Sequence, residues 1–303
     1  MKKNNLDSIY NRLLSDKTKK SSERAILIIA IISFLIHLIL IFLIDFDLIA
    51  FESSSKLLKN PIAAIYTPFS FILVYEVYLL IYYLPKSITT YIRKQYEIIT
   101  LIIIRRLFKD LSSLELSSNW FQIKDDLQFT YDLIASVLLF YLLYLFYSKS
   151  QKSYNYREKI EDSTLPTTTT RFIDLKKIIA ICLVPLLLIL ATYTFISWTI
   201  DTFYSSDQLT DSFKNINNIF FDEFFTILII VDVILLLLSF FRTDEFHKVI
   251  RNSGFIISTI LIRLSFSVEG LVNTVLIVSA ITFGLLMLTI HDKYEKITRP
   301  NNG

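Results

Sequence analysis

Glycine, cysteine and histidine are all scarce in this chain. Its 303 residues include only four glycines, one cysteine and three histidines. A single cysteine excludes a disulfide framework and any zinc site built from several cysteines. The chain also has no His-Glu-x-x-His, no Gly-x-Ser-x-Gly and no glycine-rich phosphate loop. We therefore expect no enzyme activity, no catalytic residue, and no bound metal or cofactor.

Long apolar runs dominate the composition instead. Hydrophobic residues make up 53% of the chain, and the mean hydropathy is +0.52. A helix needs ~20 apolar residues to cross the ~30 Å hydrocarbon layer of a membrane. The segments of about this length are 25–44, 68–84, 89–108, 130–147, 177–198, 224–241, 246–266 and 271–290. The sequence therefore predicts an all-α integral membrane protein with eight transmembrane helices that contact the lipid bilayer.

Basic residues are distributed unevenly between the two sides of these spans. The segments on the side of the N-terminus carry 23 Lys and Arg residues, whereas the loops on the other side carry 5. Because basic segments stay in the cytoplasm, both termini are predicted to be cytoplasmic. The predicted order is a basic segment (1–24), a four-helix group (25–147), a linker (148–176), a second four-helix group (177–291) and a tail (292–303).

Polar stretches outside the spans have less regular patterns. In the N-terminal segment, the spacing of Leu6 and Leu13 fits a short amphipathic helix on the membrane surface. An unstructured tail that only sets the topology is the alternative. The linker is charged and rich in Ser and Thr, so we expect it to be exposed. Segment 199–222 is acidic and is expected to form a loop.

One arrangement of arginines occurs twice. Arg93 and Arg105 lie twelve residues apart with an apolar run between them, and Arg251 and Arg263 do the same. A shift of 158 residues places the first pair on the second. Two matched arginines inside apolar segments indicate a duplicated four-helix unit. Because an even number of spans separates the copies, the two repeats are predicted to be parallel.

An acid interrupts the apolar segment before each arginine pair, Glu76 in the first half and Asp232 in the second. Counted at ~1.5 Å per residue from the cytoplasmic side, each acid lies within reach of the second arginine. We therefore expect intramembrane pairs of Glu76 with Arg105 and of Asp232 with Arg263, because an unpaired charge there costs ~2.5–3.5 kcal/mol. Such pairs either line a gate or a path for ions or protons, or simply fix the register of the helices.

Further polar residues suggest contacts with anions. Arg93, His247, Lys248 and Arg251 lie at the cytoplasmic ends of predicted spans, where they could bind an anion or an anionic lipid headgroup. Plain anchoring at the membrane interface is the alternative. His37 lies within an apolar span, either on a path for ions or as a hydrogen-bonded residue inside the bundle. No basic and aromatic surface indicates nucleic-acid binding.

The second half of the chain resembles the phosphate-starvation-inducible E family. These are small four-span proteins of the bacterial inner membrane, with an acid in the second span, a His-x-x-x-Arg motif and a second arginine further along. The matching residues here are Asp232, His247, Arg251 and Arg263, followed by the LIVSA sequence at 276–280. The resemblance implies a four-span fold in the bacterial inner membrane, and it implies no particular activity.

The first half keeps part of the same pattern. Glu76, Arg93 and Arg105 are present, but Thr89 stands where the family has its histidine. The resemblance thus implies a tandem duplication of the family's four-span unit.

Two classes of function fit these features. The first is a channel or transporter for an ion or small solute, lined by the paired charges. The second is a non-transporting sensor, scaffold or membrane anchor for a partner, related to stress or defence. Two charge pairs at matching depth exceed what helix packing requires, and this favours the first class. Self-association or a partner membrane protein is expected in either case, but no nucleic-acid partner.

Overall fold

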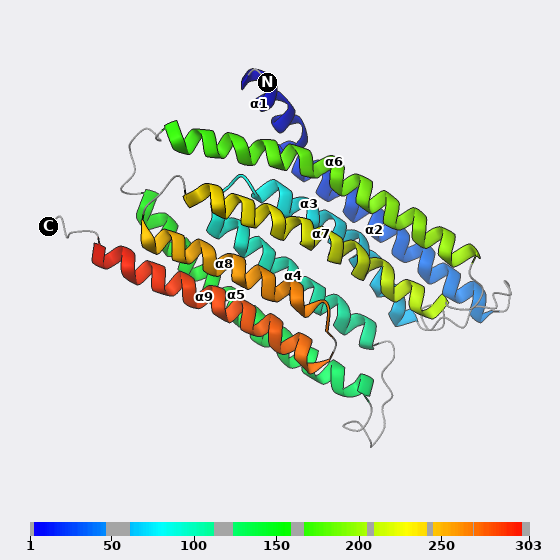
Figure 1. The fold of residues 1–303 in the computed structure, drawn as a ribbon. Coiled ribbons are helices and arrows are strands. Elements are labelled where there is room, and N and C mark those ends of the chain that lie inside the picture. The colour runs from blue at the N-terminus through cyan, green and yellow to red at the C-terminus, as the bar shows by residue number, and fades with distance from the viewer. Residues whose placement is uncertain are drawn as a thin grey trace. The chain divides into compact units, whose positions relative to one another are not determined.

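Helices account for all regular structure in the described part of the chain (Figure 1). The computed structural model describes residues 3–46, 61–111, 124–158, 167–204, 209–240, 245–268 and 270–298. The helices are α1 (Lys3–Leu13), α2 (Asp16–Asp45), the 3-10 helix η2 (Pro61–Ile65), α3 (Tyr66–Tyr83), α4 (Ile88–Leu111), α5 (Lys124–Glu158), α6 (Thr167–Tyr204), α7 (Leu209–Phe240), α8 (Phe246–Ser265) and α9 (Leu271–Thr298). Each predicted span overlaps one of α2 to α9, so the all-α class is confirmed.

Several helices extend beyond the apolar runs that predicted them. The basic N-terminal segment is helical, and α2 begins after Ser15, whose side chain accepts a hydrogen bond from the Thr18 amide at 3.1 Å. α5 continues to Glu158 and α6 begins at Thr167, so only residues 159–166 of the predicted linker lie outside the described residues. The sequence over 148–158 has no glycine or proline to end the helix.

Two other polar stretches are also corrected. The predicted loop over 199–222 is helical up to Tyr204 and again from Leu209, with 205–208 outside the described residues. The C-terminal tail is helical as far as Thr298. The helices α6, α7 and α9 therefore extend past the apolar segments that predicted them.

Three helical stretches are long and apolar enough to cross a membrane, judged by length and composition: Asn5–Asp45, Asp126–Gln151 and Leu271–Ile297. Much of the apolar surface of α2 is exposed, including Ile31 at 59% and Ile39 at 57%. Exposure of such an apolar surface is unfavourable in water, whereas its contact with lipid chains is favourable. The chain is therefore a helical membrane protein that spans the bilayer more than once. The further spans and the orientation stay predictions.

The chain divides into two compact units. Unit 1 consists of Met1–Tyr82, Leu101–Leu133 and Ala180–Phe224, and unit 2 consists of Tyr83–Thr100, Ile134–Ile179 and Phe225–Gly303. Each unit draws on both halves of the sequence. This division is therefore independent of the predicted duplication, which stays a prediction.

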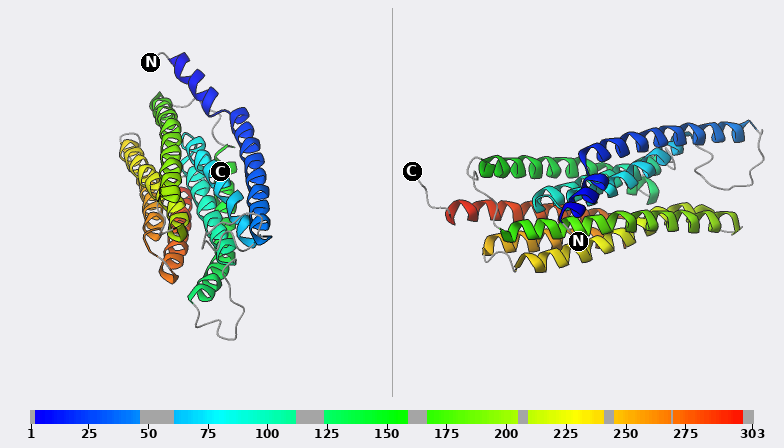
Figure 2. Two further views of the ribbon diagram at one scale, coloured as in Figure 1. Left: turned by 90° about the vertical axis from the view of Figure 1, so that its right-hand side faces the viewer. Right: turned by 90° about the horizontal axis from the view of Figure 1, so that it is seen from above.

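Within unit 1, α2 and α3 lie side by side (Figure 2), and tyrosines of α3 form hydrogen bonds to α1 and α2. The hydroxyl of Tyr82 donates to Asp16 at 2.5 Å, and that of Tyr78 donates to the Leu13 carbonyl at 2.9 Å. These bonds satisfy polar groups beside the buried side chains of Leu14 and Leu80.

Within unit 2, α8 and α9 lie side by side (Figure 1). Ser258 donates to the Ala280 carbonyl at 2.6 Å, so the hydroxyl of Tyr96 on α4 must be the donor in its 2.7 Å bond to Ser258. A Cβ atom at Gly284 would lie 1.7 Å from the Tyr96 hydroxyl. The glycine thus makes room for the buried tyrosine that joins α4 to the α8–α9 pair.

Candidate functional site

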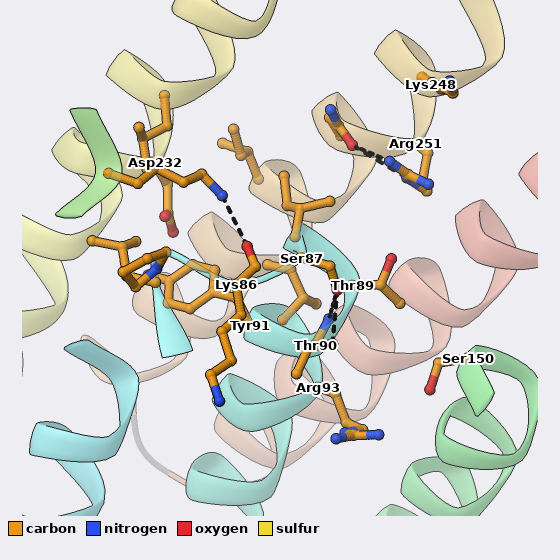
Figure 3. Close-up of a pocket in the computed structure, with 18 of the residues that line it drawn as sticks. Lys86, Ser87, Thr89, Thr90, Tyr91, Arg93, Ser150, Asp232, Lys248 and Arg251 are labelled. Atoms are coloured by element: carbon orange, nitrogen blue, oxygen red, sulfur yellow. Dashed lines mark hydrogen bonds between the residues drawn. The ribbon is translucent and has the colours of Figure 1, made fainter. Parts of the chain in front are cut away.

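A cavity of about 650 Å³ lies within unit 2. The segment before α4, the first turns of α4, α6 and α8, and parts of α5, α7 and α9 surround it (Figure 3). Its ionisable side chains other than tyrosine are five cations and one acid: Lys86, Arg93, Lys176, Lys248, Arg251 and Asp232. A cavity with this excess of positive charge is suited to an anion.

The first turn of α4 adds further donors to the cavity wall. Pro85 lies between α3 and α4, and Ser87 caps α4 by accepting a hydrogen bond from the Thr90 amide at 3.2 Å. The first-turn amides of a helix carry partial positive charge, which favours an anion. The hydroxyl groups of Ser87, Thr89 and Thr90 lie in the same wall and can donate hydrogen bonds to anionic oxygens.

Asp232 on α7 belongs to a buried polar network. Its side chain is 5% exposed and accepts a hydrogen bond from Gln95 Nε2 at 3.1 Å. Gln95 in turn accepts from the Thr259 hydroxyl at 2.8 Å. The buried Tyr91 hydroxyl lies close to both Gln95 and the Asp232 carboxyl. The Asp232 carboxyl group thus lines the cavity and is held there by a neutral donor, the Gln95 amide.

Lys176 is the cation that acts on Asp232. Its side chain is buried, and its Nζ donates to the Lys86 carbonyl at 3.2 Å. Its positive charge also reaches the Asp232 carboxyl. Lys176 is therefore held in the cavity wall within the influence of both the acid and any bound anion.

Arg251 on α8 is held in place from two sides. It donates from Nε and Nη2 to the Asn252 side-chain oxygen at 3.2 and 3.0 Å, and its Nη1 lies 2.9 Å from His291 Nε2. Because a guanidinium only donates, His291 accepts at Nε2 and carries its proton on Nδ1, 3.3 Å from the His247 carbonyl. This network fixes the arginine before any ligand arrives.

The other two α-helical cations have acidic neighbours. Arg93 Nε lies 3.8 Å from a Glu97 oxygen, and its guanidinium lies 4.7 Å from the centre of the Tyr147 ring. Lys248 donates to Glu245 at 2.8 Å, and this hydrogen bond lowers the pKa of the Glu245 carboxyl. Both cations can exchange these partly exposed partners for a ligand at small cost.

The structure brings together most of the residues predicted to contact anions. Arg93, Lys248 and Arg251 line one cavity. His247 does not line it, but its ring stacks on His291 with centroids 5.1 Å apart. Interfacial anchoring alone does not require such convergence, so the geometry favours the anion-binding interpretation.

The predicted ion pair of Asp232 with Arg263 stays a prediction, and the structure gives both residues other hydrogen-bond partners. Arg263 donates to the Thr226 hydroxyl at 3.0 Å and to Ser267 at 3.4 Å, while Asp232 accepts from Gln95. At ~1.5 Å per residue, Arg263 lies ~26 Å from the start of α8, but Asp232 lies only ~12 Å from the end of α7. The predicted depth of Arg263 was counted from Arg251. Because Arg251 lies about one and a half turns inside α8, that depth was too small.

Unit 1 holds the other predicted polar residues. Glu76 lies on α3 and the buried Arg105 on α4, and their pairing stays a prediction. His37 Nδ1 lies 2.5 Å from the Thr67 hydroxyl, which gives the ring a hydrogen-bond partner inside the unit.

Sequence reasoning missed the residues that complete the site. Lys176 was assigned to an exposed linker, Gln95 was one polar residue in a long apolar helix, and His291 is the first residue past the last predicted span. The available signal was position: Lys86, Lys176 and His291 all flank predicted spans on the side that also carries Arg251.

The group of possible metal ligands beside Arg251 is poorly suited to a metal ion. His291, Asp292 and Glu295 offer atoms within 4.8 Å of one another. However, His291 Nε2 already accepts a hydrogen bond from the positively charged Arg251. A second cation at this nitrogen would be repelled, so the cluster fits the support of Arg251 better than metal binding.

No family model, curated protein or solved structure matches this chain. The resemblance to the phosphate-starvation-inducible E family therefore stays a prediction, and the cavity is the feature that points to a function.

Proposed function

We propose that this protein is a multi-pass membrane transporter that binds a small oxyanion in the cavity of unit 2. The observation that carries the proposal is the convergence of five cations, a helix N-terminus and hydroxyl groups on one cavity with a single acid. On the predicted topology the cavity lies toward the cytoplasm. The family resemblance supports a location in the bacterial inner membrane.

The balance of charge supports an anion even when nearby acids are included. Adding Glu97 and Glu245 to Asp232 gives three acids against five cations around the cavity. A single pair of opposite charges ~4 Å apart contributes ~4 kcal/mol at an effective dielectric constant of ~20. Two cations in excess are therefore enough to hold an anion that has shed part of its hydration.

The ligand chemistry is that of a tetrahedral oxyanion, which guanidinium groups, ammonium groups and helix amides all recognise. Free phosphate or sulfate and the phosphate of a lipid headgroup share this chemistry. Free sulfate is the simplest probe, since it binds only if a soluble oxyanion can enter the cavity.

Sulfate binding to the purified protein in detergent tests the proposal. We expect calorimetry to show saturable binding that Lys176→Met and Arg251→Gln each weaken by at least about tenfold, the effect of losing one charge-assisted hydrogen bond. Lys296→Met is the matched control, because Lys296 is exposed on α9 and does not line the cavity. Equal affinity in all four proteins, or no binding of sulfate, would reject the cavity as an oxyanion site.

Uptake of radiolabelled sulfate into liposomes that contain the protein tests transport separately. We expect uptake by the wild type and reduced uptake by Lys176→Met. Binding without uptake would assign the protein to the non-transporting class, as a membrane sensor of anions.

A further inference from the structure

Asp232 is out of place in a cavity that binds anions. It is the one carboxyl group among the lining residues, and it is almost completely buried. An ionised carboxylate would repel an oxyanion in the same cavity, and the low dielectric environment would strengthen that repulsion. A cavity built only to hold an anion would be better without this acid.

The surroundings of Asp232 allow it to exist in either protonation state. Gln95 donates one hydrogen bond to it, which serves a carboxylate and equally the carbonyl oxygen of a carboxylic acid. Thr259 fixes the orientation of Gln95. The nearby buried Tyr91 hydroxyl can donate a hydrogen bond to the carboxylate or accept one from the protonated acid.

The charged groups around Asp232 come from several helices. α4 and the segment before it contribute Lys86, Tyr91 and Arg93, α6 contributes Lys176, and α8 contributes Lys248 and Arg251. The lining residues from α5 and α9 have no ionisable side chain; they are Ser150, Gln151 and Leu288. Of these cations, Lys176 acts on the Asp232 carboxyl group through its charge.

We propose that Asp232 takes up a proton from solution when an oxyanion enters the cavity, so that the cavity binds anion and proton together. This inference rests on the proposed function and adds a coupling ion to it. With Asp232 ionised, the charge of Lys176 is divided between the carboxylate and the anion. Once Asp232 is protonated, Lys176 interacts with the anion alone, and the new O–H group can donate to an anionic oxygen.

The proposal makes the protein a proton-coupled anion transporter. The anion and the proton enter the cavity together, which lowers the net charge that has to cross the membrane. No covalent bond forms or breaks except the O–H bond of the Asp232 carboxyl group. The same linkage requires the anion to bind more tightly as the pH falls.

The dependence of sulfate affinity on pH tests this coupling, because the charge of sulfate is constant between about pH 5 and pH 8. As the pH increases within this window, we expect the dissociation constant of the wild type for sulfate to rise by up to about tenfold per pH unit. Asp232→Asn mimics the protonated acid and keeps an acceptor for Gln95. It should bind sulfate tightly with little dependence on pH.

Two controls isolate Asp232. Glu223→Gln makes the same change of charge on an exposed residue of α7 and should keep the pH dependence of the wild type. His291→Gln removes an imidazole and keeps an acceptor for Arg251, so it should keep the pH dependence as well. Loss of the pH dependence in His291→Gln, with its retention in Asp232→Asn, would overturn the proposal.

Direct measurement of proton uptake requires no variant. Addition of sulfate to the wild type in weakly buffered solution should remove up to about one proton from solution per bound anion. Sulfate binding without proton uptake and without pH dependence would refute the coupling and leave the proposed function intact. A complete lack of sulfate binding would instead refute the proposed function.

Discussion

Each unit contains a buried aspartate, and the two have opposite surroundings. Asp132 in unit 1 has a fully buried side chain that is paired with Arg106, whose Nη2 donates at 2.7 Å, and it also accepts from Gln128 at 3.0 Å. Asp232 in unit 2 has Gln95 as its hydrogen-bond donor and lines a cavity. A paired acid keeps one charge state, whereas an acid with a neutral donor can change state when a ligand arrives.

This difference distinguishes a structural charge from a functional one. Both acids interrupt apolar helices, and their chemistry is identical in isolation. The partner decides the role: a guanidinium fixes Asp132, and an amide leaves Asp232 free to respond. The predictions below test this distinction, beginning with the change of largest expected effect.

Removal of Arg106 should be the most damaging change. Arg106→Ala leaves the Asp132 carboxylate buried without its cation, at an expected cost of ~3–5 kcal/mol in unfolding free energy. Asp132→Ala should cost less, since the Arg106 side chain is 27% exposed and can reach solvent or headgroups. The double variant should recover much of the loss. Denaturant unfolding in detergent measures all three, and strictly additive losses would show that the pair does not stabilise unit 1.

Replacing the glutamine that bonds to each acid should have the second-largest effect on stability, and the effect should differ between the two units. Gln95→Leu removes the donor to Asp232 and should cost ~1–3 kcal/mol, the penalty for a buried polar group that loses its partner. Gln128→Leu is the matched control, because Asp132 keeps Arg106 when Gln128 is lost. If Gln95→Leu and Gln128→Leu lower the unfolding free energy by the same amount, Gln95 is not the group that holds Asp232.

The pattern of the sequence was sufficient to predict where α2 to α9 lie, but not where several of them begin and end. Apolar runs of span length marked α2 to α9, because burial in lipid or protein requires such runs. Positions near the helix ends were also informative: Arg93, Lys248 and Arg251 lie near the starts of two spans that are predicted to run in the same direction, and the structure brings them to one cavity. Local composition and alternating direction determine both features.

Contacts between helices distant in sequence were beyond this reasoning. Nothing in the sequence pairs Gln95 with Asp232, 137 residues further along the chain. Likewise, the choice between Arg263 and Gln95 as the partner of Asp232 depends on how far each helix extends past its charged end. Lys176 was mistaken for a linker residue because a buried lysine at a helix start and a solvated one have the same local sequence.

Neutralising Asp232 should have a small effect on stability. In Asp232→Asn the side-chain oxygen still accepts from Gln95, so we expect a change of less than ~1 kcal/mol in unfolding free energy at neutral pH. Thermal unfolding in detergent checks this value. A loss as large as that of Arg106→Ala would mean that the Asp232 charge is structural, contrary to the contrast drawn here.

The exposed acid Glu245 should show the smallest effect. The Lys248 hydrogen bond lowers the pKa of its carboxyl group in the folded state. A lowered pKa adds stability above the unfolded pKa of ~4.3, and that stability is lost as the pH falls through the folded value. Because Glu245 is half exposed, the gain should be only ~0.2–1 kcal/mol. The wild type should therefore be slightly more stable than Glu245→Gln near pH 7, and this difference should vanish as the pH falls. Thermal unfolding of both proteins from pH 7 downward measures it.

The location of a bound oxyanion is the most direct test of the central claim. X-ray diffraction at the selenium edge, from crystals of the protein grown with selenate, locates the anion without a functional assay. The account predicts an anomalous peak inside the unit 2 cavity, within hydrogen-bonding distance of Lys176 or Arg251, and no such peak in crystals of Lys176→Met. An empty cavity in wild-type crystals, with selenate bound only at the protein surface, would contradict it.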